Sequence, residues 1–140
     1  MTEAAFWRNA VYLIPYFVDS SGSSQWCYLE FSRGVGFIGG GVEGAETNLE
    51  AIQREVKEEV LDARFDFGRL RELTQKYEFY NPVRKVNERH TYFMLLLPNK
   101  LELKSAESAV KIAWADSDKV LSLLEYDEQR SFLVKQIKYS

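Results

Sequence analysis

The sequence lacks several features that mark particular classes of protein. Cys27 is the only cysteine among the 140 residues, which excludes an internal disulfide and a thiolate metal site. This scarcity favours a reducing, cytoplasmic location. No run of apolar residues approaches the length needed to cross a bilayer, so we expect no association with a membrane. Residues 1–19 also lack a basic leader followed by an apolar stretch, and they are typical of a strand rather than a signal peptide.

Positive charge is also in deficit. The 18 lysines and arginines are outnumbered by 21 aspartates and glutamates, and the formal net charge is -3. This balance argues against a general nucleic-acid binder held by phosphate contacts, although a nucleotide substrate is compatible with it. The hydrophobic content of 46% suits a single domain over residues 1–140 with a full core.

Two short segments near the start predict a β-hairpin. Residues 11–18 and 25–31 are rich in aromatic and β-branched residues, and the turn-forming stretch 19–24 separates them. Pro15 within the first segment would suit an edge strand or a bulge, because proline cannot donate to a ladder. Residues 32–41 are expected to form a glycine-rich loop.

The next segment predicts an amphipathic helix. Thr47 and Glu50 have the spacing of a capping box, which marks a helix start. Apolar residues then recur on one stripe at helical spacing. The stripe consists of Leu49, Ile52, Val56 and Val60. The neighbouring stripe carries Ala51 and three glutamates, so one face would dock on a sheet while the acidic edge points into a cavity.

The remaining segments complete an α/β pattern. Strands are expected at 91–97 and 110–115, and amphipathic helices at 117–126 and 127–138, with Ser117 as the cap of the first helix. Short strands with helices at the middle and end of the chain predict an α/β sandwich, in which helices cover a mixed β-sheet.

Three glutamates lie close together at the expected end of the middle helix. Glu55, Glu58 and Glu59 would meet on one helical face, where they repel each other and oppose the negative pole of the helix dipole. The arrangement needs a compensating positive charge. Carboxylates beside a glycine loop suit a hard cation such as Mg²⁺, which takes further oxygens from water and substrate phosphates. A solvated acidic face is the alternative, and composition alone leaves the two interpretations level.

The spacing of these residues separates the two interpretations. Gly40, five residues, Glu46, seven residues and then Arg-Glu-Val-Lys-Glu-Glu at 54–59 resembles the Nudix box. Gly39 and Glu43 also match the habit of that family, and the order of strands and helices is similar over the whole chain. The resemblance implies the Nudix α/β/α sandwich and a hydrolase of phosphoanhydride bonds.

The end of the box departs from the pattern. Leu61 stands at the position of the terminal glycine, and Asp62 stands where an apolar residue is usual. Ile38 and Ala45 replace a frequent proline and a frequent glycine. The terminal glycine normally permits a left-handed residue after the helix. We therefore expect a sharp turn with positive φ at Leu61, and the alternative is a helix that continues through Asp62.

The resemblance implies roles for the residues of the box. Glu55, Glu58 and Glu59 should bind Mg²⁺ or Mn²⁺ together with the backbone carbonyl of Gly39, and the metal would activate a water for hydrolysis. Glu58 is the favoured general base. Arg54 belongs to the same catalytic group, and it is expected to orient a carboxylate through its guanidinium fork.

Three residues outside the box also have expected roles. By the same resemblance, Glu107 is a further candidate metal ligand, and a solvated loop acid is an equally good interpretation. Trp114, seven residues later, is expected in the core rather than against a ligand. His90 at a strand start is expected to be structural.

Substrate contacts are expected among basic and aromatic residues. Residues 81–90 should join two strands, and Arg84 and Lys85 within them could hold the outer phosphates of a polyphosphate. Arg33, before the glycine loop, is a second phosphate candidate, and Tyr80 offers a face to a base. A solvated hairpin tip is the alternative for each basic residue of the loop.

The predicted function is the Mg²⁺-dependent hydrolysis of a small-molecule nucleotide, with a nucleoside triphosphate as the first choice. A dinucleoside polyphosphate or a capped RNA end is the alternative substrate. A Nudix-fold nucleotide-binding regulator without catalysis is the alternative from another class, and the complete set of box acids argues against it. The chain is expected to act as a monomer or homodimer.

Overall fold

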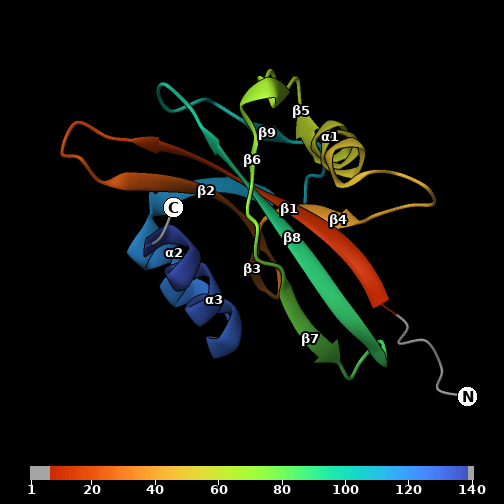
Figure 1. Cartoon of the computed structure of the whole chain (residues 1–140). Coiled ribbons are helices and arrows are strands. Elements are labelled where there is room, and N and C mark those ends of the chain that lie inside the picture. The colour runs from red at the N-terminus through yellow and green to blue at the C-terminus, as the bar shows by residue number, and fades with distance from the viewer. Residues whose placement is uncertain (1–6, 139–140) are drawn as a thin grey trace, which may run out of the picture.

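The computed structural model describes residues 7–138 (Figure 1). Its strands and helices, in chain order, are β1 (Trp7–Val18), β2 (Ser24–Phe31), β3 (Gly34–Gly36), β4 (Ile38–Gly41), α1 (Asn48–Glu59), β5 (Val60–Leu61), β6 (Arg71–Glu72), β7 (Tyr77–Asn81), β8 (Val86–Leu96), β9 (Lys104–Ser105), β10 (Lys111–Asp116), α2 (Ser117–Leu123) and α3 (Asp127–Lys138). A 3₁₀ turn, η1 (Phe67–Arg69), lies between β5 and β6.

Within these residues, eight strands form one mixed sheet, and β5 and β9 form a separate ladder. The main path runs β10-β2-β1-β8-β6, with β3 beside β2, β4 beside β1 and β7 beside β8. β1 and β8 are parallel, from the Trp7–Asn87 pair to the Tyr16–Leu96 pair. This alignment brings the start of β1 beside the start of β8, although the two segments lie far apart in the sequence.

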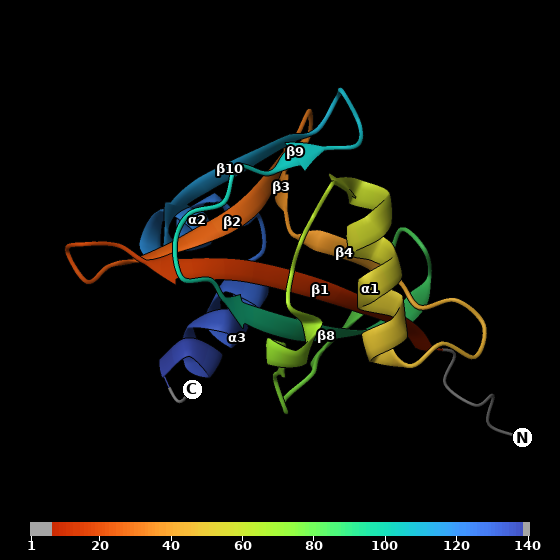
Figure 2. The ribbon, with the colours of Figure 1, turned by 90° about the horizontal axis from the view of Figure 1, so that it is seen from above.

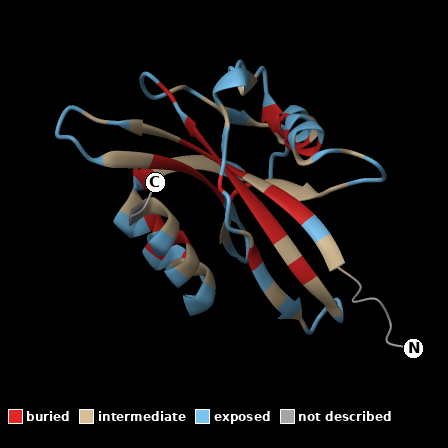
Figure 3. Cartoon of the chain, viewed as in Figure 1, coloured by how far each residue is buried: buried red, intermediate tan, exposed pale blue. Residues whose placement is uncertain are grey.

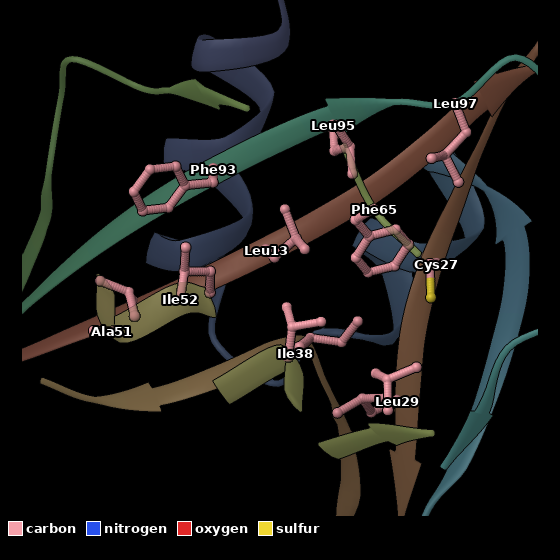
Figure 4. Packing of buried hydrophobic residues seen from close by; sticks show 13 residues of the cluster. Leu13, Cys27, Leu29, Ile38, Ala51, Ile52, Phe65, Phe93, Leu95 and Leu97 are labelled. Atoms are coloured by element: carbon pink, nitrogen blue, oxygen red, sulfur yellow. The ribbon is translucent and has the colours of Figure 1, made fainter. Parts of the chain in front are cut away.

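Helix α1 covers one face of the sheet. Its residues Ala51, Ile52 and Val56 form one apolar cluster with Leu13 of β1 and Phe93 of β8 (Figure 4). Alternate side chains of a strand point to opposite faces, so this cluster draws on every second residue of β1 and β8.

Helices α2 and α3 cover the opposite face (Figures 1 and 2). Val120 and Leu121 of α2 and Leu133 of α3 form a second cluster with Ile14 of β1 and Tyr92 of β8. The two central strands are therefore buried on both sides, as Figure 3 shows. The arrangement confirms the α/β/α sandwich that the sequence predicts.

The hairpin of β1 and β2 is confirmed, but β1 is a central strand rather than an edge. On the side away from β8, it pairs with β4 as far as Leu13 and with β2 from Tyr16 onward. Pro15 lies between these two ladders. On this side of β1, neither β4 nor β2 is paired with Pro15, so no ladder hydrogen bond is lost through its missing N–H. This explains how a proline is tolerated in a central strand.

Two local expectations are wrong. Residues 32–41 contain the strands β3 and β4 rather than forming only a loop. Their glycines allow other groups to pack closely against the backbone, and they do not interrupt the pairing of the strands. Helix α2 begins where predicted, but its cap is Asp116, whose carboxylate accepts the Lys119 N–H at 2.8 Å. Ser117 is the first helical residue.

Candidate active site

Helix α1 begins as the sequence predicts. The Thr47 hydroxyl accepts the Glu50 N–H at 3.1 Å, and the Glu50 carboxylate accepts the Thr47 N–H at 2.9 Å, which confirms the capping box. The predicted apolar stripe is wrong at Leu49, which is exposed. The buried face is rotated toward the acidic stripe instead, so Ala51 and Glu55 are buried.

The end of α1 differs from both predicted alternatives. The helix stops at Glu59, and Val60 and Leu61 form the extended strand β5. The left-handed residue is Asp62, with a φ of 50°, rather than Leu61. Aspartate tolerates this conformation better than leucine does, because its short polar side chain can hydrogen-bond locally. The prediction for Leu61 is therefore wrong, and the chain turns one residue later.

Two glycines of β4 allow the acidic face of α1 to approach the sheet. A Cβ on Gly40 would lie 2.6 Å from Oε1 of Glu55. A Cβ on Gly39, whose φ is 153°, would lie 2.0 Å from the carbonyl oxygen of Val11. Neither position has room for a side chain. The Glu55 carboxyl therefore lies directly against the β4 backbone.

Arg54 compensates much of the acidic charge. Its Nε and Nη2 donate to Glu46 at 2.7 and 3.1 Å, and Nη2 also donates to the carbonyl oxygen of Gly41 at 2.8 Å. Its Nη1 donates to Glu55 at 3.1 Å and to Glu58 at 3.3 Å. One guanidinium thus connects the loop before α1 to two of the three clustered glutamates.

Glu59 alone of these three has no bond to Arg54 within the described chain. Its Oε2 accepts the Gly39 N–H at 2.9 Å. Burial, followed by the neighbouring Glu55 carboxyl, raises the pKa of Glu59 from 4.5 to about 8, and the Glu107 charge adds a smaller contribution. Metal-free Glu59 therefore holds a proton at neutral pH. One guanidinium and one proton thus offset part of the charge of the three carboxyl groups.

A short ladder holds the loop that carries Glu107 beside the end of α1. β5 pairs with β9, and the Ala106 N–H that follows donates to the Glu59 carbonyl oxygen at 2.9 Å. Glu107 itself is exposed, and its charge is close enough to raise the pKa of Glu59. Its role as a metal ligand stays a prediction.

The donor chemistry of this cluster fits a hard divalent cation. Glu55 and Glu59 bring carboxyl oxygens together beside Gly39, and Glu58 is 56% exposed and able to turn. Mg²⁺ and Mn²⁺ prefer such oxygen donors. No group of three or more acidic, histidine or cysteine side chains in residues 7–138 is arranged as a metal site. Arg54 and the Gly39 N–H engage carboxylate oxygens of the cluster. Metal binding would have to displace the Glu59 proton.

The basic candidates of the chain's second half lie on a tight hairpin. β7 and β8 pair as far as Asn81–Val86, so only residues 82–85 form the turn. The predicted connection over 81–90 is therefore wrong, since residues 86–90 belong to β8. The Asn81 carboxamide oxygen stabilises the turn by accepting the N–H groups of residues 83 and 84.

The hairpin displays the three substrate candidates differently. The Arg84 side chain is 57% exposed, and Tyr80 is 58% exposed on β7. Lys85 has a φ of 57°, so it is the left-handed residue of the turn. Their contacts with a substrate stay predictions.

A buried polar network occupies the part of β8 that was expected to be loop. Glu88 is 2% exposed. Its Oε1 accepts Nη1 of Arg8 at 2.8 Å and lies 2.9 Å from Nε2 of His90, and its Oε2 accepts Nδ2 of Asn81 at 2.6 Å. Burial raises the pKa of Glu88, but the hydrogen bonds from His90, Asn81 and Arg8 outweigh it and leave the pKa lowered. These partners allow a carboxylate to be buried in a strand.

Sequence reasoning missed Arg8 and Glu88 because no local pattern connects residues 80 positions apart. His90 is 8% exposed, and its ring lies 4.9 Å from the Tyr12 ring and 5.0 Å from the Phe79 ring. Burial lowers the pKa of His90, and the Glu88 carboxylate opposes this shift. Nε2 acts as the donor in the contact with Glu88, because a carboxylate only accepts. This position agrees with the structural role expected for His90.

Comparison with known proteins decides the family. The NUDIX domain family model matches residues 17–136. The chain belongs to the Nudix family. Membership also shows the predicted enzyme class, a Nudix-type pyrophosphohydrolase, and enzymes of this family generally use divalent metal ions. No curated protein matches the chain.

Solved structures share the Nudix fold at low sequence identity. A C. elegans Ap4A hydrolase in a binary complex is 17% identical, with a TM-score of 0.74 over 94% of this chain and 96% of that chain. A MutT protein from Methanosarcina mazei Go1 is 16% identical, with a TM-score of 0.74 over 99% and 98%. An E. coli dihydroneopterin triphosphate pyrophosphohydrolase is 20% identical, with a TM-score of 0.69 over 88% and 90%.

Two predicted residues lie outside the contacts of the Nudix box. Arg33, in the β2–β3 turn, lines a cleft of about 650 Å³ with Leu123 and Glu125. Trp114 is partly buried, with its ring edge-on to Phe17 at 5.3 Å, which agrees with the expected place in the core.

No helix of residues 7–138 has the length and apolar character to cross a membrane.

Proposed function

We propose that the protein hydrolyses a phosphoanhydride bond of a nucleoside triphosphate, with Mg²⁺ or Mn²⁺ as cofactor. Glu55, Glu58 and Glu59, with the Gly39 carbonyl and Glu107, would hold the cation. The observation that carries the proposal is the Glu55–Glu59 carboxyl pair, which packs against two glycines in a setting that raises the pKa of Glu59. Perturbed carboxyl groups gathered in this way are typical of functional sites.

The residues of the site would have separate roles in this reaction. A divalent cation would neutralise phosphate oxygens and make water more acidic. Arg54 holds Glu55 in place and connects the helix to the loop before it. Glu58 is the proposed general base, because its exposed carboxylate can reach a water, whereas Glu55 is enclosed at 9% exposure.

A dinucleoside polyphosphate is the second candidate substrate. The fold similarity to the C. elegans Ap4A hydrolase over nearly the full length of both chains favours it. A capped RNA end, a cytoplasmic location and a monomeric or homodimeric state stay predictions from the sequence, as does the single domain over residues 1–140.

The test is a substrate panel with purified protein. Nucleoside triphosphates, diadenosine polyphosphates, nucleotide sugars and capped RNA are incubated with Mg²⁺, and the products are identified by ³¹P NMR. We expect hydrolysis that stops with chelator and falls by orders of magnitude in Glu59→Gln, as expected for loss of a metal ligand. Glu102→Gln, an exposed acid outside the box, is the matched control. Turnover that survives the chelator would contradict the proposal.

A further inference from the structure

β1 and β8 begin at the same end of the sheet (Figure 1). A cleft that carries basic side chains lies there. Its volume is about 540 Å³, and its walls include Trp7, Arg8, Asn9, Gly41 and Arg84. Two guanidinium groups line it, and none of the lining residues within 7–138 carries a carboxylate. This is unusual in a chain whose net charge is -3.

The Glu88 carboxylate forms an ion pair with each of the two guanidinium groups. Its Oε1 accepts Nη1 of Arg8 at 2.8 Å, and Nε of Arg84 lies 3.7 Å from its Oε2. Two arginines in one cleft would otherwise repel each other. With the buried carboxylate between them, the three side chains carry one net positive charge, and both arginines line the cleft.

Both arginines keep donors for a further partner. Within the described chain, Arg8 donates Nη1 to Glu88 and also interacts with the Tyr12 hydroxyl, which leaves further N–H groups of its guanidinium for a ligand. The Arg84 side chain is more than half exposed. A guanidinium presents five N–H donors in a planar fork that matches phosphate oxygens. The pair is therefore suited to bind a phosphate group between them.

The cleft adjoins the Nudix box. Gly41, which lines the cleft, accepts Nη2 of Arg54 at 2.8 Å on its carbonyl oxygen. A Cβ at Gly41 would lie only 3.2 Å from Nη2 of Arg8. One glycine thus lies between Arg54, which orients the catalytic glutamates, and Arg8. A phosphate chain that begins at the glutamates can continue past Gly41 into the cleft.

We infer that the Arg8–Arg84 cleft binds a phosphate group of the substrate outside the bond that is hydrolysed, and that Glu88 positions both arginines. The inference rests on the proposed function, because it assigns the cleft to the same substrate. It favours substrates whose phosphate chain extends beyond the attacked bond.

The test titrates metal-free protein with inorganic tripolyphosphate in a calorimeter. Arg84→Gln should weaken binding by about tenfold or more, the loss typical of a charge-assisted hydrogen bond. Arg69→Gln changes an exposed arginine whose ion pair among the described residues is with Asp66, and this variant should bind as the wild type does. Arg84 is the primary variant because it is exposed, whereas truncating Arg8 would leave the buried Glu88 without its 2.8 Å partner.

Glu88→Gln separates positioning from simple electrostatics. The change removes a negative charge, so charge alone would tighten tripolyphosphate binding. If Glu88 positions the arginines, binding should weaken instead, in a variant whose folding is checked by its melting curve. Tighter binding in Glu88→Gln would overturn the positioning role.

Kinetic measurements distinguish the proposed anion-binding cleft from the proposed hydrolase function. With Mg²⁺, Arg84→Gln should raise KM most for the longest phosphate chain and change kcat little. Unchanged tripolyphosphate binding and unchanged KM would overturn the inference, while hydrolysis by the wild type would still support the function. Binding lost in Arg84→Gln without any hydrolysis by the wild type would support the anion site and overturn the function.

Discussion

Arg54 and a proton on Glu59 together offset part of the charge of the acidic helix. The guanidinium engages Glu46, Glu55 and Glu58, and it leaves Glu59 to the Gly39 N–H and the proton. Like charges at this spacing repel each other, so the cluster lowers the stability of the helix. Binding of a cation in place of the proton would explain why the three glutamates lie together.

The proton on Glu59 predicts a pH dependence of stability. Because folding raises the pKa of Glu59 from 4.5 to about 8, the folded protein binds this proton more tightly than the unfolded chain does. The stabilisation from proton binding is fully present below pH 4.5 and is lost as the pH rises toward 8. Metal-free wild type should therefore lose stability across this window relative to Glu59→Gln, as measured by urea unfolding with chelator.

The control for this prediction is Glu102→Gln, which should follow the pH dependence of the wild type. Parallel curves for the wild type and Glu59→Gln between pH 5 and pH 8 would show that Glu59 is ionised in the folded protein. The charge of the helix would then be compensated in another way.

The turn after α1 gives a second prediction at this scale. Asp62→Gly should leave stability unchanged or raise it by up to about 1 kcal/mol, because glycine adopts positive φ without strain. Leu61→Gly should lower it by roughly 0.5–1 kcal/mol, since glycine weakens a strand. Urea denaturation of both variants measures the difference. The opposite order of stabilities would place the left-handed residue at Leu61.

At the scale of elements, short β-ladders determine the position of residues that the helix and strand patterns of the sequence do not locate. β5 and β9 contribute only two residues each, yet their pairing brings the loop of Glu107 beside the last turn of α1. The turn of β7 and β8 likewise places Arg84 near the start of β1. Both connections lie at the ends of larger elements that the apolar cores hold in place.

The bond from Ala106 to Glu59 offers a test of the Glu107 loop. Ala106→Pro removes the N–H that donates to the Glu59 carbonyl oxygen, while Ala106→Gly keeps it. If Glu107 assists metal binding, Ala106→Pro should lower Mg²⁺-dependent activity about as far as Glu107→Gln does, with only a small loss of stability at this exposed position. Full activity in Ala106→Pro would show that the loop is not part of the site.

Local signals in the sequence predicted the elements best where one residue type decides the structure. The capping box of Thr47 and Glu50 placed the start of α1 correctly. The first half of β8 was missed because Glu88 and His90 interrupt its apolar pattern, and their partners are distant in sequence. Leu61 was misplaced because the alignment to a box glycine cannot show that the next residue adopts the left-handed conformation.

At the scale of the whole molecule, the mixed sheet determines which distant residues meet. The parallel pairing of β1 with β8 brings Arg8 to Glu88, and the antiparallel pairing of β1 with β4 brings the box glycines to the same region. The box glutamates were predicted from a local spacing that resembles the Nudix box. The cleft of Arg8 and Arg84 could be found only after the strand order was known.

A calorimetric titration of metal-free protein with Mn²⁺, repeated in buffers of different ionisation enthalpy, tests the central claim most directly. With the pKa of Glu59 at about 8, binding at pH 7 should release close to one proton for each metal bound. Glu59→Gln should bind more weakly and release no such proton. Binding by the wild type without proton release, or equal binding by Glu59→Gln, would contradict the assignment of the metal site to this carboxyl cluster.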